Sequence, residues 1–178
     1  VALMKENSSI LELTSYNSDT LTKDKLYKNA LDLYKIKDSL EKYLSKKTNQ
    51  LFDLEDKIML YDLTNTYFEG TKRKSELAKF GRSKEKRSDA KLVVLGLVVN
   101  PQGFVKYSSV YDGNMADCAT LISTIKKLRS NTSDTEKRAL VVIDAGIATA
   151  ENLKAIKDEN FDYLCVTRSY LKDYKECN

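Results

Sequence analysis

Two aspartates occupy positions suited to carboxylate chemistry, because each lies at or beside the end of an apolar segment with the composition of a strand. Asp62 lies in IMLYDLTN and Asp144 lies in ALVVIDAG. An ionised carboxylate among apolar residues loses hydration, so it needs a hydrogen bond, a counter-charge or a metal ion. Either each aspartate caps a turn or helix through backbone N–H groups, or the two carboxylates lie on neighbouring strands and bind divalent cations together.

The composition restricts which metals these carboxylates can bind. The 178 residues include no histidine, and the three cysteines are far apart. This argues against a zinc site and excludes a histidine base, whereas oxygen-only ligands suit Mg²⁺ or Mn²⁺. Two such ions, about 3.5–4 Å apart, can activate a water or a 3′-hydroxyl and stabilise the leaving oxygen in phosphoryl transfer.

The cysteines are Cys118, Cys165 and Cys177. We interpret them as reduced, inert thiols of a cytosolic protein, with Cys165 in a buried strand. No apolar run approaches the roughly 20 residues of a membrane-spanning helix, so no membrane partner is expected.

Positive charge is concentrated in residues 71–91. This segment has nine basic and three acidic residues, a net of +6, whereas the whole chain carries +4 and the remainder therefore −2. It has no apolar period, so we expect a solvated loop. The loop is either an ordinary soluble surface or a surface that contacts DNA phosphates. The second interpretation assigns DNA binding to Lys72, Arg73, Lys74, Arg82, Lys84, Lys86 and Arg87.

The N-terminal part of the chain is predicted to be helical. Residues 1–20 are polar and lack a clear period, so we expect a frayed arm or a short helix there. Over 22–54, apolar residues recur at three- and four-residue steps, which predicts one long or two consecutive amphipathic helices. Their Lys-rich outer face is interpreted as solvated, with DNA contact as the alternative. We therefore expect an α-helical segment over residues 1–55.

From Lys57 the pattern changes to strands. The segment 92–99, LVVLGLVV, is almost continuously apolar, as in a strand covered on both faces. NPQG follows it with the chemistry of a turn, which predicts a β-hairpin with 104–111. The predicted strands are 58–64, 92–99, 104–111, 139–144 and 161–166, with helices beginning at the caps Asp117 and Thr149. This order predicts an α/β fold, a mixed sheet with helices packed on it.

Four segments resemble, in order, the catalytic core of bacterial insertion-sequence transposases of the DDE type. The resemblance covers about residues 57–168, and the branch is the one whose third acid lies in a Tyr-Arg-Glu-Lys signature. The segments are YDLTNTYFEG (61–70), FGRSKEKRSDAKLVVLGLVVNPQGF (80–104), YDGNMAD (111–117) and VVIDAGIATAENL (141–153).

The resemblance implies an RNase H-like fold that cuts and joins double-stranded DNA with two Mg²⁺ or Mn²⁺ ions. Asp62 matches the first catalytic acid and would bind both ions, and Asp144 matches the second and would bind one. Thr64 and Asn65 follow the first acid as in the family and would support the site. The implied partners are element ends and target DNA, with a homo-oligomer assembled on them, in the bacterial cytoplasm and on the nucleoid when bound to DNA.

Two departures from the family pattern limit this resemblance. Lys86, Arg87, Ser88 and Asp89 stand where the family has a stretch closer to H-R-P-D. No Y-x-x-R-x-x-x-E-x-x-x-x-x-x-K pattern occurs, and Glu151, Glu159 and Glu176 are interpreted as solvated residues. The chain opens VALMKENSS, so we expect a fragment whose partial core over 56–178 stops before the third acid and is inactive alone.

Other functions remain open from the residues alone. The runner-up is a catalytically silent nucleic-acid-binding or assembly module of the same fold, and a third is another RNase H-like nuclease such as a resolvase. A Rossmann-type enzyme is disfavoured, because neither G-x-G-x-x-G nor a P-loop occurs. Four tyrosines in or beside strands are predicted to pack in the core, because a tyrosine nucleophile would normally need histidine partners: Tyr61, Tyr67, Tyr107 and Tyr111.

Overall fold

The computed structural model describes residues 22–82, 88–131 and 138–166. Within the chain, one compact unit ends at Tyr43 and a second begins at Leu44. Lys84, Lys86 and Arg87 of the predicted DNA-contacting loop lie outside the described residues, as do Cys177 and Glu176.

The helices predicted over 22–54 form as two consecutive helices, α3 (Lys23–Lys35) and α4 (Lys37–Phe52). The hydroxyl of Thr22 accepts a hydrogen bond from the backbone N–H of Lys25 at 3.3 Å and so caps the start of α3. The residues of α4 from Leu44 onward belong to the second unit, which also contains the sheet.

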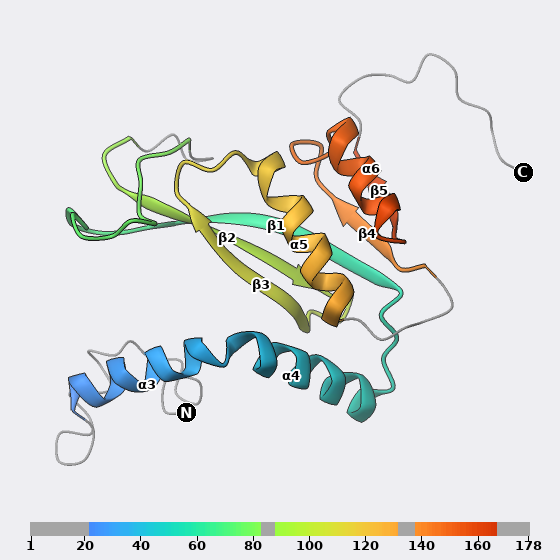
Figure 1. The fold of residues 1–178 in the computed structure, drawn as a ribbon, viewed down its shortest axis with the longest axis horizontal. Helices are drawn as coiled ribbons and strands as arrows, with labels where there is room; N and C mark the ends of the chain where they lie inside the picture. The colour runs from blue at the N-terminus through green and yellow to red at the C-terminus, as the bar shows by residue number, and fades with distance from the viewer. Residues whose placement is uncertain (1–21, 83–87, 132–137, 167–178) are drawn as a thin grey trace, which may run out of the picture. The chain divides into compact units, whose positions relative to one another are not determined.

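The second unit is built on one five-stranded sheet (Figure 1) with the strand order β3-β2-β1-β4-β5. β1, β2 and β3 pair antiparallel, whereas β4 is parallel to β1 and β5 is parallel to β4. This is the arrangement of the RNase H-like fold, so the expected fold class is confirmed. The elements are β1 (Ile58–Tyr67), β2 (Leu92–Val99), β3 (Val105–Asp112), α5 (Asp117–Asn131), β4 (Leu140–Ile143), α6 (Ala150–Asp158) and β5 (Asp162–Cys165).

The hairpin between β2 and β3 forms where the turn chemistry predicted it. Gly103 has a φ of +85°, a conformation that glycine adopts at little cost. The side-chain oxygen of Asn100 accepts a hydrogen bond from the backbone N–H of Phe104 at 2.8 Å, and the two backbones also pair there. These bonds close the turn and set the register of β2 against β3.

Side chains of β1 alternate between two faces of the sheet. Met59, Tyr61 and Leu63 are buried in the core under α5 and α6, which pack on this face and on each other. Leu60 and Asp62 point to the other face and are exposed. β2 alternates in the same way between buried and half-buried residues, so the prediction that it is covered on both faces was wrong. The apolar residues of β2 that point to its second face are half-buried, because that face is only partly covered.

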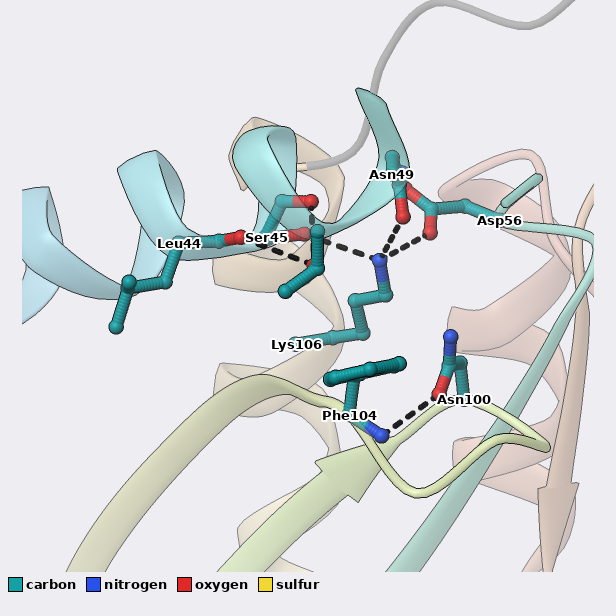
Figure 2. A network of polar contacts seen from close by, with 8 residues as sticks. Leu44, Ser45, Asn49, Asp56, Asn100, Phe104 and Lys106 are labelled. Atoms are coloured by element: carbon teal, nitrogen blue, oxygen red, sulfur yellow. Dashed lines mark hydrogen bonds and ion pairs between the residues drawn. The ribbon is translucent and has the colours of Figure 1, made fainter. Parts of the chain in front are cut away.

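The C-terminal half of α4 is joined to the sheet by a buried lysine (Figure 2). Lys106 of β3 is 1% exposed, and its ammonium lies 2.6 Å from Asp56 Oδ1, 2.6 Å from Asn49 Oδ1 and 3.3 Å from Ser45 Oγ. The ammonium donates hydrogen bonds to Asn49 and Ser45 and forms an ion pair with Asp56. Asp56 Oδ1 has no hydrogen-bond partner among the described residues besides this ion pair. The Lys106 ammonium and the Asp56 carboxylate therefore each need the opposite charge of the other to remain ionised in the buried interior.

We predict that Lys106→Met lowers the free energy of unfolding by about 3–5 kcal/mol, because it leaves the Asp56 carboxylate buried and unpaired. Adding Asp56→Leu should recover much of this loss, since an apolar pair needs no counter-charge. Urea unfolding of the single and double variants measures both effects. As a control, Arg138→Met removes an exposed ion pair with Asp162 and should cost less than about 1 kcal/mol. Equal losses for the buried and exposed pairs would contradict the prediction.

Candidate functional site

Asp62 and Asp144 occupy matching positions on neighbouring parallel strands. The register of β1 on β4 pairs Leu60 with Val142 and Tyr61 with Ile143. Asp62 and Asp144 are the next residue on each strand, one step beyond the last paired position. Neighbouring strands are about 4.8 Å apart, so the two aspartates follow residues whose backbones lie next to each other. Tyr61 and Ile143 are buried in the core, and the aspartates that follow them are exposed.

The argument that these carboxylates need compensation for lost hydration was wrong, because both aspartates are exposed. The residues on either side of Asp62, Tyr61 and Leu63, point to the opposite face of β1. Asp144 lies just after the end of β4. Each carboxylate instead accepts a hydrogen bond from the backbone N–H of the next residue, at 2.8 Å from Leu63 to Asp62 and at 2.7 Å from Ala145 to Asp144. Charge-assisted bonds of this length orient both carboxylates along their strands.

The turn after Asp144 connects the site to α6. The backbone carbonyl of Asp144 accepts hydrogen bonds from the N–H groups of Ile147 and Ala148 at 3.0 and 3.2 Å. Thr149 then caps α6, as predicted, by accepting a hydrogen bond from the N–H of Asn152 at 3.2 Å. The side-chain amide of buried Asn152 donates to the carbonyls of Ile147 and Cys118, at 2.7 Å each. Asp144 therefore lies on backbone that is bonded to both α5 and α6.

Asp62 is supported from the core side by its neighbour Tyr61. The Tyr61 hydroxyl donates to Thr120 Oγ1 on α5 at 2.7 Å, and Thr120 donates in turn to the carbonyl of Asp117 at 2.7 Å. Tyr111 of β3 joins the same group through Thr124 Oγ1 at 2.6 Å. Burial raises the pKa of Tyr61 above its ordinary value. The strand that carries Asp62 is thus hydrogen-bonded to the helix beneath it.

Tyr61→Phe should reveal this network through its pH dependence. At pH 8 the variant should lose about 1 kcal/mol of stability, because the hydrogen bond to Thr120 is absent. The raised pKa means that the contribution of Tyr61 is fully present below about pH 10, the ordinary tyrosine pKa, and is lost as the pH rises further. The difference between wild type and variant should therefore shrink by pH 11 in urea unfolding. Tyr34→Phe, at a residue 67% exposed, should show no such change. A constant difference from pH 8 to pH 11 would refute the assignment.

The two proposed supporting residues point to different faces of β1. Thr64 pairs with Leu95 and is exposed on the same face as Asp62. Asn65 pairs with Val94, which is buried in the core, and is itself half-buried on the opposite face. The structure therefore brings Thr64, and not Asn65, to the face of Asp62.

The described part of the basic segment is a loop, as predicted, and Lys72, Arg73, Lys74 and Arg82 are exposed on it. One point of the loop is tied to the sheet. Ala78 is 1% exposed, and the residue after it pairs with the first residue of β2 through two backbone hydrogen bonds.

The predictions for the tyrosines and cysteines can also be compared with the structure. Tyr61 and Tyr107 are buried, and Tyr67 and Tyr111 pack against the core, as predicted. Cys118 and Cys165 are free thiols. Both are half-buried, so Cys165 is less buried than predicted.

Neither a three-ligand metal cluster nor a membrane span is found among residues 22–82, 88–131 and 138–166. No group of three or more His, Cys, Asp or Glu side chains is placed to hold a metal ion there. No helix in those same ranges is both long and apolar enough to cross a membrane.

Comparison with known proteins gives one family match. The family model described as "Transposase DDE domain" matches residues 53–176, more than half of the chain. No curated protein matches the sequence.

Three solved structures are similar to this chain. The cryo-EM structure of a piggyBac transposase synaptic complex with hairpin DNA has a TM-score of 0.46 and 10% identity, over 68% of this chain and 25% of that chain. A Mos1 transposase paired-end complex with left transposon end has a TM-score of 0.44 and 13% identity, over 92% of this chain and 56% of that one. The crystal structure of the Mos1 mariner paired end complex with Mn has a TM-score of 0.43 and 14% identity, with the same coverage. The chain thus spans about a quarter to just over half of these structures.

Proposed function

Because the chain belongs to the transposase DDE domain family, we propose that it is the part of a bacterial transposase catalytic core that carries the first two metal-binding carboxylates. Its reaction is phosphoryl transfer on DNA, in which strands are cut and joined during transposition. The observation that supports this proposal is the register of β1 on β4, in which Asp62 and Asp144 each directly follow the last paired residues, Tyr61 and Ile143.

The two aspartates fit the oxygen-only ligand set of Mg²⁺ or Mn²⁺. Two neighbouring carboxylates repel each other, and a divalent cation between them removes that repulsion. Asp62 would hold both ions and Asp144 one of them. Two such ions, when bound, activate a water or 3′-hydroxyl and stabilise the leaving oxygen. The backbone N–H groups of Leu63 and Ala145 orient the carboxylates before any ligand arrives.

The proposed substrate is double-stranded DNA, as element ends and as target. Exposed Lys72, Arg73, Lys74 and Arg82 supply cations that can contact phosphates without regard to sequence. The proposal includes Lys84, Lys86 and Arg87 of the same segment, and a supporting role for Thr64 and Asn65. It also includes assembly as a homo-oligomer on DNA and action in the bacterial cytoplasm, on the nucleoid when bound.

We predict that Mn²⁺ binds the chain and raises its thermal unfolding midpoint, since a ligand that binds only the folded state stabilises it. Asp62→Asn and Asp144→Asn should each weaken Mn²⁺ binding by at least about tenfold. Without metal, the same variants should be as stable as wild type or slightly more stable, because they remove one of two neighbouring like charges. Calorimetric titration and thermal unfolding measure the two effects.

Asp162→Asn is the matched control, because Asp162 is an exposed aspartate on β5 whose side chain is near Arg138. It should leave Mn²⁺ binding unchanged. If Mn²⁺ stabilises all variants equally, the carboxylates do not form a metal site. The silent binding module would then be the better account, with both aspartates acting only as acceptors of backbone N–H groups.

The 178-residue chain by itself should show little or no strand transfer on a DNA end with Mg²⁺ or Mn²⁺. The family uses three acids, and the signature of the third does not occur in this sequence. A gel assay with labelled DNA ends measures cleavage and joining. Robust metal-dependent cleavage that disappears in Asp62→Ala would show that the two aspartates are sufficient and would overturn this expectation.

A further inference from the structure

A pocket of about 370 Å³ lies beyond the end of the antiparallel β1–β2 ribbon, between the segment that leaves β1 and the segment that enters β2. Its volume falls within the range of about 300–1,000 Å³ that is typical of small-ligand sites. Two aromatic rings, Phe68 and Phe80, line it together with Arg73 and Lys91. Neither the metal-site proposal nor the charge of the basic segment accounts for the two rings.

The rings are carried by backbone that is bonded to the same two residues at the start of β2. The N–H of Phe68 donates to the carbonyl of Lys91 at 2.9 Å. Lys79, which precedes Phe80, exchanges two backbone hydrogen bonds with Leu92, at 3.1 and 2.9 Å. The backbone that carries the two rings is therefore held together through one dipeptide, which favours a pre-formed site.

The backbone on the far side of Phe80 is fixed equally closely. A Cβ atom on Gly81 would lie 1.8 Å from the carbonyl oxygen of Gly113, so only glycine permits this approach. The Lys79 ammonium also forms an ion pair with Asp112 at the end of β3. Despite this anchoring, the Phe80 side chain is 60% exposed. A single exposed phenylalanine is ordinary, but this one lies at the wall of a pocket on constrained backbone, where a ligand can reach it.

Cations surround the rings, with acids among them. The ammonium of Lys72 lies 5.1 Å from the centre of the Phe68 ring. The backbone carbonyl of Lys72 accepts a hydrogen bond from the Lys91 ammonium at 3.4 Å, so the two residues lie close together. Arg73 and Lys91 line the pocket, as do the carboxylates of Glu69 and Asp89. Three cations against two acids leave a positive excess beside an exposed ring, Phe80, and a half-buried one, Phe68.

From this combination we infer that the pocket binds an unpaired base of a DNA strand, stacked on Phe80 and Phe68, with the flanking phosphates on Lys72, Arg73 and Lys91. Rings with adjacent cations are how proteins hold single-stranded nucleic acid, because every base has a π-face and every linkage a negative charge. A fully paired duplex keeps its bases stacked on one another and cannot fill the pocket in this way. The inference rests on the proposed DNA substrate and specifies that the pocket binds DNA with an unpaired base.

The pocket is remote from the aspartates. Phe68 is six residues beyond Asp62, about 20 Å at the rise of an extended strand. That distance is about six nucleotides along a DNA strand. The pocket would thus hold a base several nucleotides from the reacting phosphate, and a test DNA needs a single-stranded extension of about ten nucleotides.

The chain has no tryptophan, so Phe80→Trp introduces a single fluorescent reporter into the pocket. The full chain is titrated in EDTA with a duplex, with the same duplex carrying a ten-nucleotide extension, and with a version whose extension is abasic. Quenching of the tryptophan should be strong with the extended duplex and weak with the other two. Deoxyadenosine monophosphate alone should quench only at much higher concentration, because it lacks the flanking phosphates.

Val105→Trp is the reporter control. Val105 is 42% exposed and lies at the opposite end of β2 and β3, so its emission should not distinguish the three DNAs. A second variant covers the case in which Phe80→Trp does not fold. Phe80→Leu should weaken binding of the extended duplex by about 5- to 100-fold and leave the plain duplex unchanged, as measured by fluorescence anisotropy. Lys74→Gln should weaken both DNAs alike.

The outcomes separate this inference from the proposed function. If wild type binds both DNAs with equal affinity, and Phe80→Leu changes neither, the pocket does not hold a base while the proposed DNA substrate survives. If neither DNA binds, both the inference and the proposed substrate are wrong. Because the titrations are carried out in EDTA, they do not depend on the proposed metal site, and a failure of Mn²⁺ to bind would leave the result of this test unaffected.

Discussion

The parallel pairing of β1 with β4 is the constraint on which the rest of the structure depends. β1 is the central strand, with the β2–β3 hairpin on one side and β4 and β5 on the other. Because a strand alternates its side chains, burial of Tyr61 in the core directs Asp62 to the opposite face, and Asp144 directly follows buried Ile143 where β4 ends. A slip of β1 by one residue would turn Asp62 toward the core. The packing of the core therefore sets the geometry of the proposed site.

Polar contacts secure this arrangement from both sides of the sheet. On the core face, the hydroxyls of Tyr61, Thr120 and Tyr111 bond β1 and β3 to α5. On the other face, the ion pair of Lys106 and Asp56 joins β3 to the segment that enters β1. Buried polar groups of this kind contribute little net stability, but they disfavour other registers, in which they would be left unpaired.

The same backbone pairing extends beyond the strands. Lys91 and Leu92 at the start of β2 bond to Phe68 on one side and to Lys79 on the other, so a segment rich in charge is held against the end of the sheet. The family match covers residues 53–176, which include the whole sheet. The aromatic pocket is formed by the segments that follow β1 and precede β2. The Phe68 and Phe80 rings lie there beside Arg73 and Lys91.

Local features of this chain were readable from sequence alone. Thr149 as a cap and the turn at Asn100 to Gly103 depend on neighbouring residues only, so each formed where predicted. The position of Asp62 and Asp144 at the ends of apolar segments, together with the family resemblance, made them a candidate pair. Only the tertiary structure decided that they are exposed, because burial depends on which face of β1 is covered and not on the residues beside them in sequence.

Two other features depended on contacts between distant residues. Lys106 is buried because Asp56 and Asn49 meet it from segments about 50 residues away along the chain. A lysine is almost never fully buried unless it is paired, so sequence alone gives no reason to expect it inside. Phe68 and Phe80 share a pocket because β2 lies beside both. The sequence by itself determined the elements, their order and the chemistry they carry, whereas which groups meet was decided by strand register, a property that exists only once the chain has folded.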